Sequence, residues 1–166
     1  MKWFSALMCA AALTSLALLP AQASGLSKDD ASYLTITMQA QLGRYALGTL
    51  AMKNAHSPKV KAFAKALAGD AGAQTRHLDA MAKRYGLPIA KQPDVRASYH
   101  YSQLSGLHGA QFDRRFIQDL QIGDSVAAEQ QSAEAKNGAN EALKKYAQQR
   151  LQALNREQSN LGSLHA

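Results

Sequence analysis

One amphipathic stripe, between Ser57 and Gly86, constrains the fold of this chain more than any other feature. Apolar or small residues recur there in steps of three, four and seven, which is the spacing of one face of an α-helix. They are Val60, Phe63, Leu67, Ala71, Leu78, Met81 and Tyr85. Ser57-Pro58 predicts the helix start, because serine caps free backbone amides and proline fits the first turn. Gly86, followed by Pro88, predicts the end, and the stripe must pack against other helices.

The same spacing predicts three more long helices and one short one. The first, over 28–54, opens with Ser27 and Asp30 in capping-box spacing. Its wide stripe contains Leu34, Ile36, Met38, Ala40, Leu42, Tyr45, Leu47 and Ala51. A short helix over 95–106 and long helices over 110–136 and 141–164 follow. Two long helices, a long proline-punctuated connection and two more helices predict an all-α, ferritin-like four-helix bundle with a long crossover that carries the extra helix.

The N-terminal stretch has the pattern of a cleavable signal peptide. Lys2 precedes an apolar run that ends at Leu19, and Ala21-Gln22-Ala23 provides small residues at a cleavage position. The run is short for a membrane span, which needs about 20 apolar residues; an uncleaved anchor is the alternative. We therefore expect a signal peptide over 1–23, a single domain over 24–166, and a periplasmic or secreted protein, with outer-membrane association left open.

Composition limits the chemistry and the partners. Cleavage removes Cys9, which is the only cysteine, so the mature chain has no disulfide or thiol chemistry. The full chain carries a formal charge of +7, and a basic exported protein meets acidic partners such as lipid head groups, cell-wall polymers or an acidic protein. Nucleic acid is not expected in that compartment. Peripheral membrane association and the oligomeric state stay open.

Four short blocks resemble the recurring blocks of the domain-of-unknown-function 4142 family, which are exported ferritin-like bundle proteins of bacteria. The blocks are Leu47-Gly48-Thr49-Leu50-Ala51, Val60-Lys61-Ala62-Phe63-Ala64, Leu104-Ser105-Gly106 and Phe112-Asp113-Arg114-Arg115-Phe116. Their order and spacing extend the resemblance from about Tyr33 to Leu161. It implies the ferritin-like fold and an envelope location, and it implies little about activity, because fold does not fix function.

The chain departs from this family at the positions where ion ligands are expected. Relatives usually carry a glutamate on the first helix, Asp-His pairs on the second and third, and a histidine late in the fourth. These positions fall here on Arg44, Asp70-Ala71, Asp124-Ser125 and Glu157. A ferritin-like di-metal centre needs inward glutamates and Glu-x-x-His motifs, and this sequence has four glutamates and no such motif. We therefore expect no metal, no cofactor and no catalytic residues.

The same positions suggest an inward charged cluster as a binding site. Arg44 lies on the apolar stripe of the first helix, and Glu157 lies on that of the last. If both point inward, a guanidinium stands where relatives hold a cation, paired with Glu157 and with Asp70 or Asp124. Burial costs several kcal/mol per unpaired ion. Either every ion of this cluster is paired with another member, or the cluster does not form. The alternative is that these side chains reach the bundle end or the surface.

Two other groups have a structural and a functional interpretation. Tyr99, His100 and Tyr101 on the short helix are interpreted as a lid packed across the end of the bundle, with a ligand-lining role as the alternative. Asp113 is interpreted as a favourable charge at a helix start, because a lone acid needs a positioned partner to catalyse.

Three function classes remain. The first is a non-enzymatic envelope protein that binds an acidic or protein partner, in stress defence or as a neutraliser of a toxin. The second is a ferritin-like metal-binding or redox protein, which rests on the resemblance alone. The third is a small-molecule carrier with a pocket under the helix that carries Tyr99, His100 and Tyr101.

Overall fold

The computed structural model describes residues 25–164, all of which belong to five α-helices and their connections. The helices are α1 (Lys28–Asn54), α2 (Pro58–Arg84), α3 (Val95–Ser105), α4 (Gly109–Asn137) and α5 (Glu141–Ser163). Each begins and ends within one or two residues of the range that its apolar spacing predicts. The predicted signal peptide lies outside the described residues. No helix within residues 25–164 is long and apolar enough to cross a membrane.

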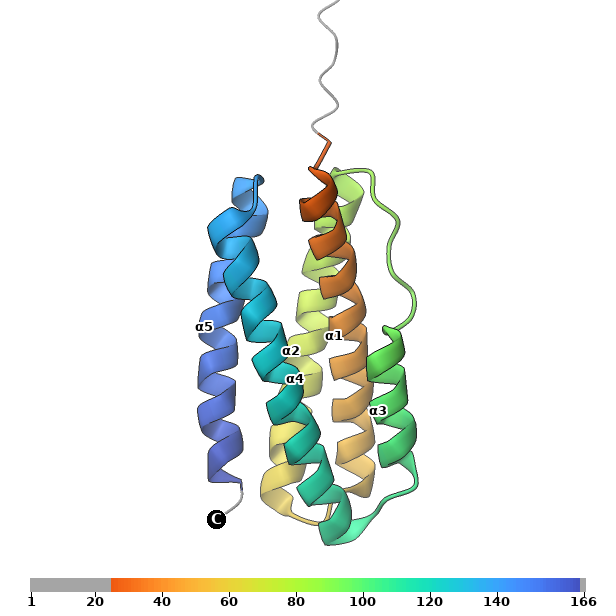
Figure 1. The fold of residues 1–166 in the computed structure, drawn as a ribbon. Helices are drawn as coiled ribbons and strands as arrows, with labels where there is room; N and C mark the ends of the chain where they lie inside the picture. Colours follow the sequence, from red (N-terminus) through yellow and green to blue (C-terminus); the bar gives the residue numbers. More distant parts are fainter. Residues whose placement is uncertain (1–24, 165–166) are drawn as a thin grey trace, which may run out of the picture.

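The helices form two antiparallel hairpins joined by a crossover (Figure 1). α1 and α2 make the first hairpin, and α4 and α5 make the second. The crossover returns the chain from the end of α2 to the opposite end of the bundle, so α2 and α4 run in the same direction (Figure 1). This is the predicted ferritin-like connection, with one long crossover between the second and third long helices.

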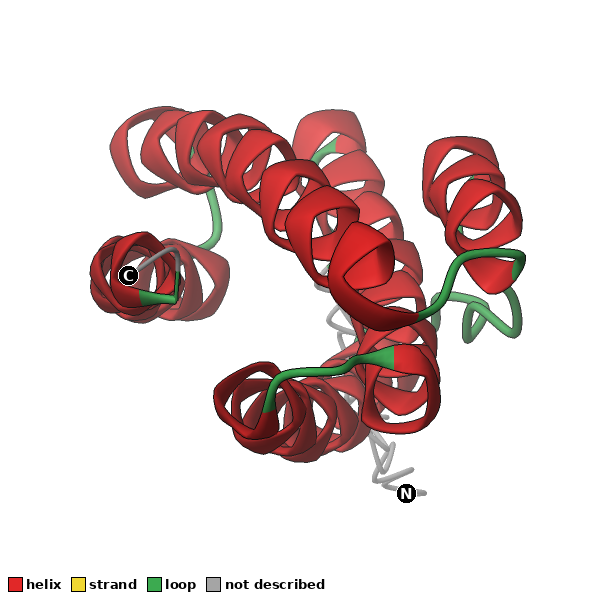
Figure 2. Ribbon diagram, turned by 90° about the horizontal axis from the view of Figure 1, so that it is seen from below, coloured by secondary structure: helices red, strands yellow, loops and turns green. Residues whose placement is uncertain are grey.

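The crossover helix α3 lies along the side of the bundle, against α1 and α4 (Figures 1 and 2). This position corrects the prediction of a lid across the bundle end. The reason is a close approach to α1, because a Cβ added at Gly43 would lie 2.5 Å from the Cβ of Ala97. Two small residues at one crossing point let the helix axes lie close together, and α3 therefore docks along the length of α1.

The helix ends follow the predicted signals in most places. The Ser27 side chain accepts a hydrogen bond from the Asp30 amide at 3.0 Å, which confirms the cap of α1. Gly86 has a positive φ of 71° and lets the Leu87 amide donate to the Ala82 carbonyl at 2.9 Å. Ser57 is the exception, since its side chain makes no capping hydrogen bond.

An aspartate from the other hairpin binds the turn that precedes α2. The backbone amides of His56 and Ser57 donate to the two carboxylate oxygens of Asp113, at 2.9 and 2.8 Å. Asp113 lies on α4 and is 8% exposed. Asp113 therefore also holds the α1–α2 turn, a contact that its interpretation as a favourable charge at a helix start did not include.

The core consists of two apolar clusters at opposite ends of the bundle. The larger one lies where α1 ends and α4 begins, and includes Leu47, Val60, Leu104, Phe112, Phe116 and Leu161. The smaller one lies where α1 begins and α2 ends, and includes Tyr33, Leu34, Met38, Leu78, Leu143 and Tyr146. Buried polar side chains lie between them on the same helices. This middle layer is where the candidate site is found.

Candidate functional site

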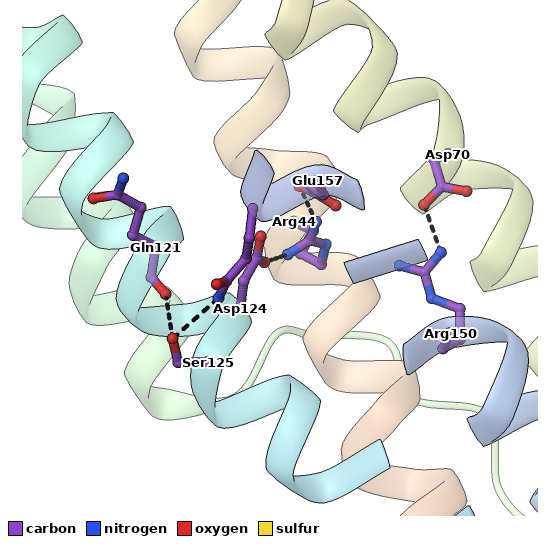
Figure 3. A network of polar contacts seen from close by, with 8 residues as sticks. Arg44, Asp70, Gln121, Asp124, Ser125, Arg150 and Glu157 are labelled. Atoms are coloured by element: carbon purple, nitrogen blue, oxygen red, sulfur yellow. Dashed lines mark hydrogen bonds and ion pairs between the residues drawn. The ribbon is translucent and has the colours of Figure 1, made fainter. Parts of the chain in front are cut away.

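Arg44 of α1 lies between two carboxylates that come from the other hairpin (Figure 3). Its Nη1 donates a hydrogen bond to Asp124 of α4, and its Nη2 donates to Glu157 of α5. The side chains of Arg44, Asp124 and Glu157 are 11%, 0% and 14% exposed. Arg44, Asp124 and Glu157 therefore point inward and form an ion-paired triad between the hairpins.

Asp70 does not join this triad. Its carboxylate accepts a hydrogen bond from Arg150 of α5 at 2.9 Å (Figure 3). Asp70 is 43% exposed at its side chain, whereas Arg150 is only 6% exposed. Of the two acids considered as the second partner of Arg44, the structure brings Asp124 to it and gives Asp70 a different arginine.

Sequence reasoning missed Arg150, although a signal for it was present. Arg150 lies three residues after Ala147 and four before Leu154, both of which are buried on α5. A charged residue at that position of an inward stripe predicts a buried ion that needs a partner. The middle layer therefore holds two arginines and three acids, of which Asp70 alone is substantially exposed.

Burial and ion pairing oppose each other in the triad. Burial would lower the pKa of Arg44, but the adjacent charges of Glu157 and Asp124 outweigh it, so the pKa of Arg44 is raised. Burial raises the pKa of Asp124 and of Glu157, and the attraction of Arg44 offsets only part of that shift. The guanidinium therefore stays ionised, and the two carboxyls are the groups that take up protons on acidification.

The triad does not fit a divalent metal ion. The Arg44 guanidinium lies between the carboxylates of Asp124 and Glu157. It would repel a metal ion at this position and compete with it for the same two carboxylates. Within residues 25–164, no group of three or more His, Cys, Asp or Glu side chains is arranged to hold a metal ion. The residues at these positions therefore supply a cation of their own.

The three residues expected to form a lid have separate environments. Tyr99 and Tyr101 are 59% and 41% exposed, so their rings lie at the surface of α3, and neither lines the cleft between α1, α3 and α4. His100 faces the bundle, and its Nδ1 lies 3.2 Å from a carboxylate oxygen of Asp119 on α4. The other carboxylate oxygen of Asp119 accepts a hydrogen bond from Arg115 at 2.8 Å.

A cleft of about 110 Å³ lies between α1, α3 and α4, beside the triad. Its walls are mostly apolar and come from Ile36, Ala40, Leu47, Leu120, Ile122 and Ala127. Arg44 also lines it, and Arg96 and His100 line its α3 side. Ile36 and Ile122 are 44% and 55% exposed. Two large apolar side chains therefore stand at the edge of an apolar depression.

Ile36 and Tyr45 belong to the apolar stripe that the sequence assigns to α1, but both are exposed, Tyr45 to 50%. α1 contacts α2, α3 and α4, and these neighbours leave Ile36 and Tyr45 partly uncovered. Ile36 lies at the cleft. A sequence pattern cannot distinguish such an exposed apolar residue from a buried one.

A second depression runs between α2 and α5, on a different face of the bundle. It has a volume of about 460 Å³ and is lined by Asp70, His77, Tyr146, Arg150 and Arg156. The ring of His77 stacks on that of Tyr146 with centroids 5.6 Å apart. Burial raises the pKa of Tyr146. Side chains therefore bridge α2 and α5, chiefly through the Asp70–Arg150 ion pair (Figure 3).

The fold and the site together define a ferritin-like, all-α bundle in which an arginine–carboxylate triad occupies the middle layer. The chain belongs to the family described as domain of unknown function DUF4142, which it matches over residues 15–164. This match confirms the family that the four sequence blocks resemble. No curated protein matches the chain.

One solved structure has a similar fold. It is the crystal structure of a DUF305 fragment from Deinococcus radiodurans, with a TM-score of 0.75 and 16% sequence identity. The similarity covers 85% of this chain and 98% of that one. At this identity the likeness concerns the helical fold alone.

Proposed function

We propose that this chain is an exported helical-bundle protein that acts by binding a protein partner and has no enzymatic role. Export is supported by the signal-peptide pattern of residues 1–23. The binding role is supported chiefly by the α1–α3–α4 cleft, where exposed Ile36 and Ile122 flank an apolar depression. Exposed apolar side chains around a pocket are typical of interfaces, where one buried anchor contributes much of the affinity.

The size of the cleft favours a protein partner over a small-molecule ligand. Pockets that enclose drug-sized ligands measure about 300–1,000 Å³, and this cleft measures about 110 Å³. A cavity of about 150 Å³ admits a benzene ring, so this smaller cleft has room for no more than one small aliphatic side chain of a partner. The carrier alternative would need a larger space under α3.

The metal-binding alternative conflicts with the triad. A di-metal centre needs several carboxylates that converge on the ion, and here Asp124 and Glu157 converge on Arg44. Metal analysis of the protein recovered from cells tests this point directly. Stoichiometric iron or manganese would overturn the proposal.

Site-specific photo-crosslinking tests the binding role. A photoreactive residue at Ile36 should give a discrete cross-linked product in the intact cell envelope, and the substitution Ile122→Asp should abolish it by placing a charge in the cleft. The matched control carries the photoreactive residue at Lys145, which is exposed on α5 away from the cleft. Equal products from positions 36 and 145, or a product that survives Ile122→Asp, would contradict the proposal.

A further inference from the structure

The positive charge of this protein is concentrated on one helix. α2 carries six Lys or Arg residues and two Asp residues, whereas α4 carries three basic and five acidic residues. The excess of α2 is not compensated by its neighbours, because among the described residues its only ion pair joins Asp70 to Arg150. The electrostatic field is therefore strongest on the α2 side.

Four of the cations on α2 lie in one straight row. At 3.6 residues per turn, Lys61, Lys65, Arg76 and Lys83 fall within an arc of about 60° and span about 33 Å. All four are exposed. None of them makes an ion pair with any described residue, whereas Arg115, Lys144 and Arg150 elsewhere do. Asp79, on the same face, is the one acid in the row and is partly buried.

Two partly exposed side chains of α1, one amphipathic and one apolar, border this row. A Cβ placed on Gly72, in the middle of the row, would lie 3.7 Å from the ring of Tyr45. Tyr45 is 50% exposed, and Met52, two turns further along α1, is 37% exposed. The antiparallel packing of α1 on α2 places Met52 near the Lys61–Lys65 end of the row. The surface thus combines cations with partly exposed apolar groups.

We propose that this basic face, formed by Lys61, Lys65, Arg76 and Lys83 with Tyr45 and Met52, docks on the surface of a bilayer that contains anionic phospholipid. A straight row of cations on a rigid helix contacts a plane along its whole length. None of the four cations lines any of the four main depressions of the described residues, and a straight row on one helix fits a plane better than a compact anion.

The chemistry of the side chains fits that surface. Anionic head groups attract basic side chains within about 10 Å at moderate salt, so only cations that reach the surface together contribute. Lysine stems can lie along the interface while their ammonium groups stay in water. Tyrosine is enriched at the membrane–water interface because its ring is apolar and its hydroxyl is polar.

Docking by this face would leave the cleft accessible. α3, which forms one wall of the cleft, lies on the side of α1 away from α2 (Figure 2). The membrane surface is thus a second binding surface, independent of the α1–α3–α4 cleft. Loss of one is not expected to alter the other, so failure of this inference leaves the proposed function intact.

Vesicle co-sedimentation of the protein as recovered from cells tests the inference. We expect binding to vesicles with 30% phosphatidylglycerol in phosphatidylcholine at 50 mM salt, and at least tenfold weaker binding at 500 mM salt. Vesicles of phosphatidylcholine alone should bind at least tenfold more weakly. Equal binding to both compositions would overturn the inference, because it would show attachment through apolar residues.

A matched pair of charge reversals separates this face from net charge. Lys65→Glu with Arg76→Glu should weaken binding to the anionic vesicles at least tenfold. Lys91→Glu with Lys145→Glu makes the same change in net charge at two exposed positions outside the face and should change binding less than twofold. Circular dichroism verifies that both variants are folded.

Two outcomes would overturn the inference. One is an equal loss of binding in the two double variants, which would show an effect of net charge without a defined surface. The other is vesicle binding that soluble polyphosphate abolishes at a phosphate concentration equal to that of the anionic lipid. That result would identify a polyanion as the better ligand of the same face.

Discussion

Arg44 shows how one residue can change what a protein interior is able to hold. Its guanidinium places a fixed positive charge between Asp124 and Glu157, and each of the three needs the other two, because a buried ion without a partner costs several kcal/mol. The inward position of Arg44 and Glu157 could be expected from the apolar residues around them. Which acid would be the second partner could not, because Asp70 lies on α2 and Asp124 on α4, both of which contact α1, and only the packing of the helices decides between them.

Removal of Arg44 should therefore be costly. Arg44→Ala leaves Asp124 and Glu157 buried beside each other without a counter-charge, and we expect the free energy of unfolding to fall by about 3–5 kcal/mol. Urea denaturation at neutral pH measures this change. The triple variant Arg44→Leu, Asp124→Asn, Glu157→Gln removes all three charges and should lose much less. A single variant that is no less stable than the triple variant would show that the triad is not an energetic unit.

Glu134 gives a second residue-scale prediction, one that concerns pH. Burial, together with the adjacent carboxylate of Asp30, raises the pKa of Glu134 to about 7 from a usual 4.5. Between these values the folded protein binds more protons than the unfolded chain, so stability falls as pH rises through this interval. Because the carboxyl is partly screened by solvent, we expect a loss of about 1–2 kcal/mol between pH 4.5 and 7.5.

The substitution Glu134→Gln isolates this contribution. Glutamine keeps the shape of the side chain and does not ionise, so the variant should be more stable than the parent above pH 7. The two proteins should converge near pH 4.5, where Glu134 is protonated in the folded state. Thermal melting across this pH range makes the comparison, and parallel curves for the two proteins would contradict the assigned pKa.

At the scale of the helices, sequence spacing was sufficient for most of the architecture. All five helices begin and end within one or two residues of their predicted ranges, since caps and apolar periodicity are local signals. The position of α3 was not predictable in the same way. Its side-on docking depends on Gly43 and Ala97, two small residues 54 positions apart, and no local pattern identifies such a contact.

The glycines of the helices provide a matched test of that docking. Gly43→Ala would place a Cβ 2.5 Å from the Cβ of Ala97, so α3 must shift, and we expect faster hydrogen exchange in α3 and a loss of about 1–3 kcal/mol. Gly69→Ala meets no atom within 4 Å and should stabilise the protein by up to about 1 kcal/mol through helix propensity. Stabilisation by both substitutions would mean that α3 does not dock tightly on α1.

At the scale of the whole molecule, the two hairpins are joined by reciprocal aspartates. Asp113 of α4 accepts hydrogen bonds from the α1–α2 turn, and Asp30 of α1 accepts one from the Ala139 amide in the α4–α5 turn at 3.0 Å. Each acid lies in the first two turns of a hairpin's leading helix and holds the turn of the other hairpin. Burial would raise the pKa of Asp30, but hydrogen bonds from Ser27 and from backbone amides hold it below its usual value.

These contacts explain why the sequence indicated the hairpins but not the contacts that join them at their ends. Asp30 and Asp113 both stand near a helix start, where an acid is favourable for its own helix, and this local explanation conceals the longer-range role. The ion-paired triad joins the same hairpins near the middle of the bundle. Polar contacts at the middle and at both ends therefore fix how the two hairpins sit against each other.

The reciprocal arrangement predicts that loss of Asp113 affects both hairpins. Asp113→Ala leaves the His56 and Ser57 amides without their acceptor and should lower the free energy of unfolding by about 1–3 kcal/mol. Asp113→Asn keeps one acceptor oxygen, and its stability should lie between that of the parent and that of the alanine variant.

Asp94→Ala is the matched control, because the Asp94 side chain accepts a hydrogen bond only within the start of α3, from the Ala97 amide at 2.7 Å. Hydrogen exchange should then accelerate at 56 and 57 in the Asp113 variants and remain unchanged there in the control. If exchange at the Ala139 amide also accelerates in Asp113→Ala, the two ends of the bundle are coupled through the interface of the hairpins; unchanged exchange at 56 and 57 would show that Asp113 does not hold the turn.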